Sequence, residues 1–69
     1  MLENMPETLK YHLSYNCYPP VTHDMIPFCI MAIEKAKADD IDAIIEFPSG
    51  DTMTANEIIE GLNLGFYLQ

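Results

Sequence analysis

Basic residues are scarce in this chain. Three of its 69 residues are Lys or Arg and eleven are Asp or Glu, so the formal net charge at pH 7 is −8. The three are Lys10, Lys35 and Lys37, and no basic residue follows Lys37. A charge of this sign and size repels nucleic-acid phosphate and attracts a basic surface on another protein. We therefore expect no direct binding of DNA or RNA.

Cysteines and long apolar runs are also few. Cys17 and Cys29 are fewer than a small secreted domain would use, so we expect reduced, partly buried thiols, with a bond between the two left open. No run approaches the roughly 20 apolar residues that cross a bilayer, and MLENMPETLK lacks the pattern of a signal peptide. No basic amphipathic helix suggests membrane binding. These features predict an intracellular protein, located in the cytoplasm of its host cell.

The length predicts one domain over residues 1–69. A hydrophobic fraction of 49% is typical of a folded globule and not of a disordered acidic tail. A domain of this size buries only about 60% of the surface that its unfolded chain exposes. Its core therefore leaves a thin margin of stability, which a second copy of the chain could increase.

The N-terminal half contains a region of period two. Residues 1–7 have no period and are expected to be a loose lead-in. Within residues 8–17 the apolar side chains alternate with polar ones, which predicts a strand with one buried face, ended by Pro19 and Pro20. A helix should then begin at Thr22 or Asp24 and stop near Ala38, with an inward stripe made of Ile26, Cys29, Ile30, Ile33 and Ala36.

The C-terminal half is predicted as a hairpin followed by a helix. Residues 41–47 alternate as a second strand with Ile41, Ala43, Ile45 and Phe47 inward, residues 48–51 form a tight turn, and residues 52–54 return as a short strand. Thr54 and Glu57 match a capping box that opens a helix at Ala55, with Ile58, Ile59 and Leu62 inward. Residues 62–69 form a last strand if this helix stops at Gly61, or continue it. The fold class is α+β, with the order β-α-β-β-α and the last element left open.

Catalytic, metal and cofactor sites have little support in the sequence. Cys17 with His12 or His23 could pair a nucleophile with a base, but nothing indicates an orienting group, and we expect no enzyme. Cys17 and Cys29 lie twelve residues apart, wider than the close pairs of zinc sites that His12 and His23 would complete. The acids at 39–42 lack the calcium-loop pattern, and PSGDTMT lacks the lysine of a phosphate loop. We predict no metal and no cofactor.

Seven acidic residues gather in residues 39–61, which we call the acidic half. Carboxylates held on rigid elements could compete for the positively charged groove of a nucleic-acid-binding protein. The alternative is that they are the solvated faces of a small soluble domain. An exposed Ile44 between Asp42 and Glu46 would favour a contact surface. The predicted partner-binding residues are Asp39, Asp40, Asp42, Ile44, Glu46, Asp51, Glu57 and Glu60.

Two segments resemble short acidic proteins encoded by phages and other mobile elements. They are SYNCYPP, at 14–20, and TANEIIEGLNL, at 54–64. That class includes anti-CRISPR inhibitors, so the resemblance implies a non-enzymatic protein that binds host nucleoprotein machinery; it assigns no functional residue. We therefore predict an inhibitor that occupies a basic nucleic-acid-binding surface of a host protein such as a CRISPR effector. The alternative is a structural or regulatory homodimer with an apolar interface, since Tyr, Phe and Met are common in interface centres.

Overall fold

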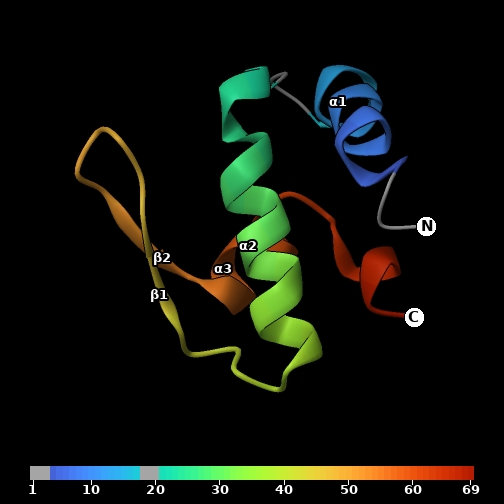
Figure 1. Cartoon of the computed structure of the whole chain (residues 1–69). Coiled ribbons are helices and arrows are strands. Elements are labelled where there is room, and N and C mark those ends of the chain that lie inside the picture. The colour runs from blue at the N-terminus through green and yellow to red at the C-terminus, as the bar shows by residue number, and fades with distance from the viewer. Residues whose placement is uncertain (1–3, 18–20) are drawn as a thin grey trace.

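The computed structural model describes residues 4–17 and 21–69, and it has an α+β fold (Figure 1). Helix α2 lies at the centre and packs against the other two helices, the first strand and both short 3₁₀ turns. The described elements, in chain order, are α1 (Met5–Tyr15), the 3₁₀ turn η2 (His23–Met25), α2 (Ile26–Lys37), β1 (Ile44–Glu46), β2 (Thr52–Thr54), α3 (Ala55–Gly61) and the 3₁₀ turn η3 (Gly65–Leu68).

The predicted first strand is wrong, because that segment forms α1. Met5, Leu9 and Leu13 repeat every four residues and are buried together, which is the spacing of one helix face. Tyr11 and Tyr15 have the same spacing on another face, where their rings pack with centroids 4.8 Å apart. The alternating residues thus form two pairs with a spacing of four, Leu9 with Leu13 and Tyr11 with Tyr15, so the pattern fits a helix as well as a strand. The predicted loose lead-in is also wrong for residues 5–7, and the prolines expected to end the element lie outside the described residues.

Helix α2 begins later than predicted and ends where predicted. The chain enters it through η2, and Pro27 occupies the first turn of the helix, where a missing N–H costs no intrahelical bond. Cys29 and Ile33 of the predicted stripe are buried, together with Ala32, and the rest of the stripe is partly buried. The predicted stripe is thus right in its centre, although the predicted caps Thr22 and Asp24 lie before and inside η2.

The last turn of α2 is closed by a left-handed residue that is not glycine. Asp39 has φ 62°, and its N–H donates to the carbonyl of Ala36 at 3.0 Å. The N–H of Asp40 donates to the carbonyl of Lys35 at 2.9 Å. This pair of bonds is a Schellman motif, which satisfies carbonyls that the helix end would otherwise leave without a donor.

Helix α3 ends at Gly61, the stop that the sequence offered, and the same motif closes its end. Asn63 has φ 57°, and its N–H lies 3.4 Å from the carbonyl of Glu60. The N–H of Leu64 donates to the carbonyl of Ile59 at 2.9 Å. The chain therefore turns at Asn63 and buries Leu64 completely, so the tail neither continues α3 nor forms a strand but becomes η3.

The hairpin follows the prediction in its turn and its second strand. Pro48 and Ser49 lie at the centre of the turn, the N–H of Gly50 donates to the carbonyl of Phe47 at 2.8 Å, and Gly50 adopts φ 93°. A left-handed residue at this place fits a three-residue hairpin loop and favours glycine. The first strand is shorter than predicted, because residues 41–43 form a turn and β1 covers only Ile44–Glu46. Ile41, predicted to point inward, is exposed.

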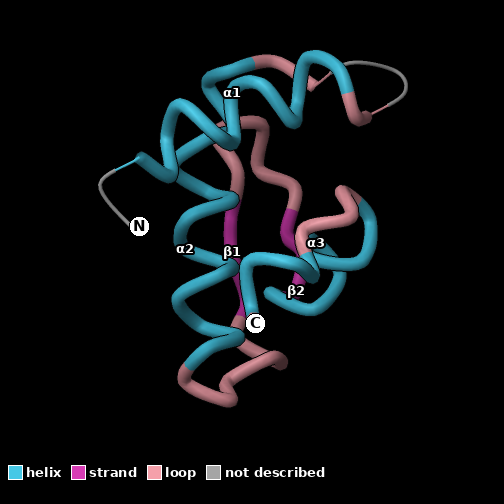
Figure 2. The backbone as a smooth tube through the Cα atoms, turned by 90° about the vertical axis from the view of Figure 1, so that its right-hand side faces the viewer, coloured by secondary structure: helices cyan, strands magenta, loops and turns pink. Residues whose placement is uncertain are grey.

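The start of α3 is tied to the hairpin by the predicted capping box, which the structure confirms. The Thr54 hydroxyl accepts from the N–H of Glu57 at 3.1 Å, and the Glu57 carboxylate accepts from the N–H of Thr54 at 2.9 Å. The N–H of Ala55 also donates to the carbonyl of Ala43 at 2.9 Å. The hairpin and α3 therefore form one unit beside α2, as both views show (Figures 1 and 2).

The core lies where the three helices and the inner face of the hairpin meet. Its largest fully buried side chains are Leu9, Leu13, Ile33, Ile45, Ile58, Leu64 and Cys29. They come from every helix, from β1 and from the residue before η3, so each element contributes to one common core. Within the described residues, no helix has the length and apolarity that a membrane span requires.

Candidate functional site

All eight predicted partner-binding residues are exposed in the structure. They lie in three places: the end of α2 and the following turn (Asp39, Asp40, Asp42), the hairpin (Ile44, Glu46, Asp51) and α3 (Glu57, Glu60). The bond from Ala55 to Ala43 brings the turn that contains Asp42 beside the first turn of α3. The structure thus places the predicted acids on the surface of neighbouring elements.

The outer face of the hairpin combines charge with an exposed apolar side chain. Side chains alternate along a strand, so Ile44 and Glu46 share one face and Ile45 takes the other. Ile44 is 67% exposed, whereas Ile45 is 2% exposed and belongs to the core. Across the sheet, Ile44 is opposite Thr54 and Glu46 is opposite Thr52. This face therefore presents Ile44 and Glu46 beside two threonines.

The acids of this region differ in what else they do. Glu57 accepts in the capping box, Glu60 accepts from the Asn56 amide at 3.1 Å, and Asp51 accepts from the Ser49 hydroxyl at 3.1 Å. Asp42 and Glu46 accept no such bond from the described residues. The carboxylates of Asp42 and Glu46, like those of Asp39 and Asp40, could therefore bind a partner without breaking a hydrogen bond between the described residues.

A depression of about 410 Å³ lies between η2 and the hairpin turn. Asp24 and Asp51 contribute carboxylates to its wall, and Met25, Phe47 and Pro48 make its apolar part. A hydrogen bond from the Thr22 side chain and, to a smaller extent, one from the backbone of Asp24 lower the pKa of the Asp24 carboxyl. The carboxyl is therefore ionised at neutral pH. The depression adds acidic surface next to the hairpin, including Asp24, which was not among the predicted contacts.

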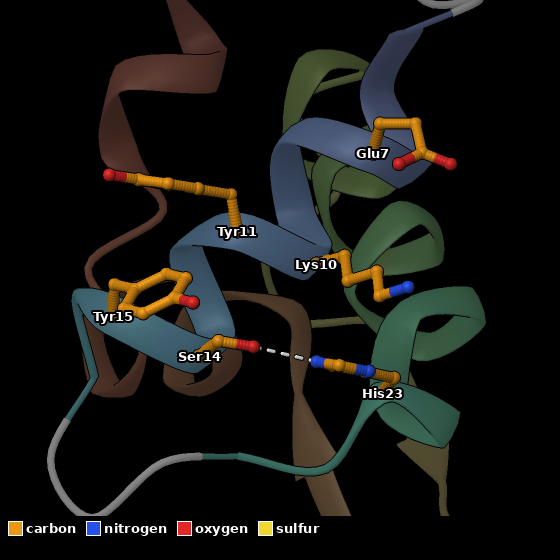
Figure 3. Close-up of a pocket in the computed structure, with 6 residues that line it drawn as sticks. All are labelled: Glu7, Lys10, Tyr11, Ser14, Tyr15 and His23. Atoms are coloured by element: carbon orange, nitrogen blue, oxygen red, sulfur yellow. Dashed lines mark hydrogen bonds between the residues drawn. The ribbon is translucent and has the colours of Figure 1, made fainter.

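A second depression, of about 350 Å³, lies along α1 and contains the one close pair of a hydroxyl and a histidine that the described residues show (Figure 3). The Ser14 hydroxyl is 2.7 Å from Nε2 of His23, and Lys10, Tyr11 and Tyr15 also border the space. Nucleophilic catalysis needs the other ring nitrogen held by an orienting group and donors for an oxyanion. The described residues give His23 no such second partner, and the bond serves to fasten η2 to α1.

His12 is a buried structural residue, although the strand prediction had placed it on the outer face. Its side chain is 6% exposed, and Nε2 lies 2.7 Å from the carbonyl of Leu62. Because a carbonyl can only accept, Nε2 carries the proton. The Cys17 sulfur lies 3.7 Å from the same oxygen, and the Phe66 ring packs on the imidazole at 5.4 Å. His12 and Cys17 therefore both contact a carbonyl at the end of α3.

The two thiols are free and protonated at neutral pH. Burial raises the pKa of the Cys29 thiol from 9.0 to about 11, with a smaller contribution from Cys17, and burial also raises the pKa of Cys17. A thiol with a raised pKa is a poor nucleophile and a poor metal ligand. The Tyr67 hydroxyl is buried without a hydrogen-bond partner among the described residues. Burial raises the pKa of Tyr67, and Cys29 makes a smaller contribution in the same direction.

The described residues bring no three His, Cys, Asp or Glu side chains close enough to hold a metal ion. The zinc set considered from the sequence is divided, since His12 and Cys17 contact Leu62 whereas His23 bonds Ser14. No protein-family model, no curated protein and no solved structure matches the chain. A functional proposal therefore rests on the surface and interior geometry of this chain.

Proposed function

We propose that the chain is a non-enzymatic binding protein whose acidic half occupies the basic nucleic-acid-binding surface of a host protein, such as a CRISPR effector. The observation that carries this proposal is the outer surface of the hairpin, where the exposed Ile44 lies between the exposed acids Asp42 and Glu46. A phage or mobile-element origin belongs to the same proposal. It follows from the resemblance of the segments at 14–20 and 54–64.

Electrostatic attraction between the acidic half and a basic surface supports this proposal. Opposite potentials on two surfaces steer their encounter and exclude partners of the wrong charge. The acids lie on a paired strand, a closed turn and a capped helix, so little backbone freedom must be lost when they bind. Ile44 would add apolar burial at the centre of such a contact. A surface of this kind competes with nucleic acid because both present negative charge to the same groove.

The test compares two variants that change the net charge equally. In the first, Asp42, Glu46 and Glu60 are replaced by Lys; Glu57 is kept because it caps α3. In the control, three acids outside the acidic half and its neighbouring depression, Glu3, Glu7 and Glu34, are replaced by Lys. Tagged proteins are used to capture partners from host lysate at low and high salt, and DNA or RNA is added as a competitor.

We expect the unmodified protein and the control variant to retain a nucleic-acid-binding protein at low salt and to release it at high salt or with added nucleic acid. The acidic-half variant should retain at most about a tenth as much, which corresponds to about 1.4 kcal/mol. Equal capture by the two variants would exclude the acidic half as the binding surface. Capture that added nucleic acid does not reduce would exclude competition for a nucleic-acid site.

A homodimer is the second candidate, and it is favoured by an aromatic face on the opposite part of the fold. Tyr11 and Tyr15 are 63% and 74% exposed, and their rings are in contact. Phe66 is also exposed, and its ring packs on His12, the residue that follows Tyr11. Figure 3 shows the ring of Tyr11 pointing outward from α1. Sedimentation of the purified protein tests this. A dimer should dissociate on dilution with little dependence on salt, and Tyr15→Lys should make it monomeric.

A further inference from the structure

The outer edge of β1 has backbone groups that β2 does not use. In an antiparallel pair, every second residue exchanges its N–H and C=O with the residue opposite. The N–H of Phe47 donates to Asp51 at 2.9 Å, and that of Ala55 donates to Ala43 at 2.9 Å, so the bonded positions of this strand have odd numbers. The N–H and C=O groups of Ile44 and Glu46 therefore point away from β2.

The other edge of the sheet is blocked at one of its two outward positions. The corresponding outward positions of β2 are Thr52 and Thr54, and the N–H of Thr54 donates to the Glu57 carboxylate at 2.9 Å. The chain then enters α3 at Ala55, so a further strand has no room to continue there. The edge with two outward positions available for pairing therefore belongs to β1, the strand with the exposed Ile44.

Edge strands in folded proteins usually carry a guard against pairing, such as a lysine, a proline or a bulge within the strand. β1 reads Ile-Ile-Glu and has none of these, and its shortness is its main protection. Its side chains instead specify a partner. Glu46 and the preceding Asp42 attract positive charge, whereas Ile44 attracts an apolar side chain.

We propose that an extended segment of the partner adds to the edge of β1 as an antiparallel third strand. On one face of that segment a basic and an apolar side chain lie opposite Glu46 and Ile44, and a second basic side chain, two residues further on, extends toward Asp42 in the turn before β1. Backbone bonds to Ile44 and Glu46 give the alignment, and the three side chains give the selectivity. The inference rests on the proposed function, because it names the part of a basic partner that the acidic half binds.

The probe is an acetylated and amidated peptide, Lys-Thr-Val-Thr-Lys-Thr. It is titrated into the full chain up to about 1 mM, the concentration at which a complex with a Kd of about 1 mM is half saturated. Backbone amide signals and amide hydrogen exchange are followed by NMR. We expect the amides of Ile44 and Glu46 to shift and to become protected from exchange. In the free protein, the amide of Ile45 should already be protected because it pairs with Met53.

Two matched peptides separate backbone pairing from attraction between charges. N-methylation of the valine removes the N–H that would donate to the carbonyl of Ile44, whereas N-methylation of the threonine after it changes an N–H that points to solvent. The charge and side chains of the two peptides are the same. We expect the first to bind at least about tenfold more weakly and the second within about twofold of the parent.

The proposal is overturned if both N-methylated peptides bind alike, if the parent peptide does not bind, or if the shifts map to α3 instead of β1. This outcome can be told apart from failure of the proposed function. If the acidic-half variant loses its captured partner while the two N-methylated peptides bind alike, the acids act through side chains alone. If the peptides differ as expected but that variant captures normally, strand pairing holds and the proposed inhibitor function fails.

Discussion

The acidic half and the aromatic end of this fold are held in place by different kinds of contact. The hairpin and α3 are joined by backbone bonds and a capping box, so most of their exposed side chains are not needed to hold them. The end formed by α1 and η3 depends on side chains instead, above all on the buried His12 at the carbonyl of Leu62. We therefore expect surface changes to be tolerated in the first region and single substitutions to destabilise the second.

The largest effect should come from breaking the aromatic end. His12→Ala removes the donor to the Leu62 carbonyl, leaves a cavity beside Phe66, and should lower the free energy of unfolding by about 2 to 4 kcal/mol. Urea unfolding followed by circular dichroism measures it. His23→Ala, which removes an exposed bond to Ser14, should cost less than about 1 kcal/mol. His12→Gln, which can still donate, should recover part of the loss; equal costs for the two Ala variants would contradict the comparison.

Alkaline pH should act on the core beside the aromatic end, where Cys29 of α2 is buried. The folded state keeps the Cys29 proton up to about pH 11, whereas the unfolded chain loses it near pH 9, so the unfolded state binds fewer protons in this window. Cys29 therefore does not lower stability below pH 9, and as the pH rises toward 11 it should lower the free energy of unfolding by at most about 2 kcal/mol. Urea unfolding at a series of pH values measures the slope. Cys29→Ala should make the fall of stability with pH shallower, although Cys17 and Tyr67 also contribute to it. An unchanged slope would show that Cys29 does not contribute.

The smallest effect should be a gain of stability in the acidic half. Asp39 adopts φ 62° and puts negative charge at the C-terminal end of α2, and both features are unfavourable. Asp39→Gly should therefore raise the free energy of unfolding by about 1 kcal/mol. Asn63→Gly at the equivalent place after α3 should gain less, since Asn is neutral and tolerates this conformation. A loss of stability in Asp39→Gly would show that the acid has a structural role after all.

Local signals explain why the C-terminal half could be predicted. The capping box, the turn at 48–51 and the stop near Ala38 each depend on residues within about five positions of one another, so tertiary contacts were not needed to find them. Residues 8–17 carry no cap, and their alternation agrees with two periods. A strand would place the Leu and Tyr residues on one face, whereas a helix places the Leu pair and the Tyr pair on different faces. Only the tertiary structure shows that the Leu pair is buried and the Tyr pair is exposed.

The candidate site shows the same limit. Charge and alternation were enough to predict that the eight contact residues could be exposed, with Ile44 among the acids. The open edge of β1 could not be predicted, because it depends on which residues of the strand bond to β2. The sequence missed Asp24 as a neighbour of the hairpin turn and the bond between Ser14 and His23, since η2 had first to be packed against both elements.

By itself the sequence determined the negative charge, the α+β class, the hairpin turn and the start of α3, because composition and short-range hydrogen bonding need no distant partner. The tertiary structure alone decided that residues 5–15 are a helix, that His12 lies inside at the end of α3, and that one strand edge faces outward. Burial and strand register are properties of the assembled fold, in which residues such as His12 and Leu62, fifty positions apart, meet at 2.7 Å.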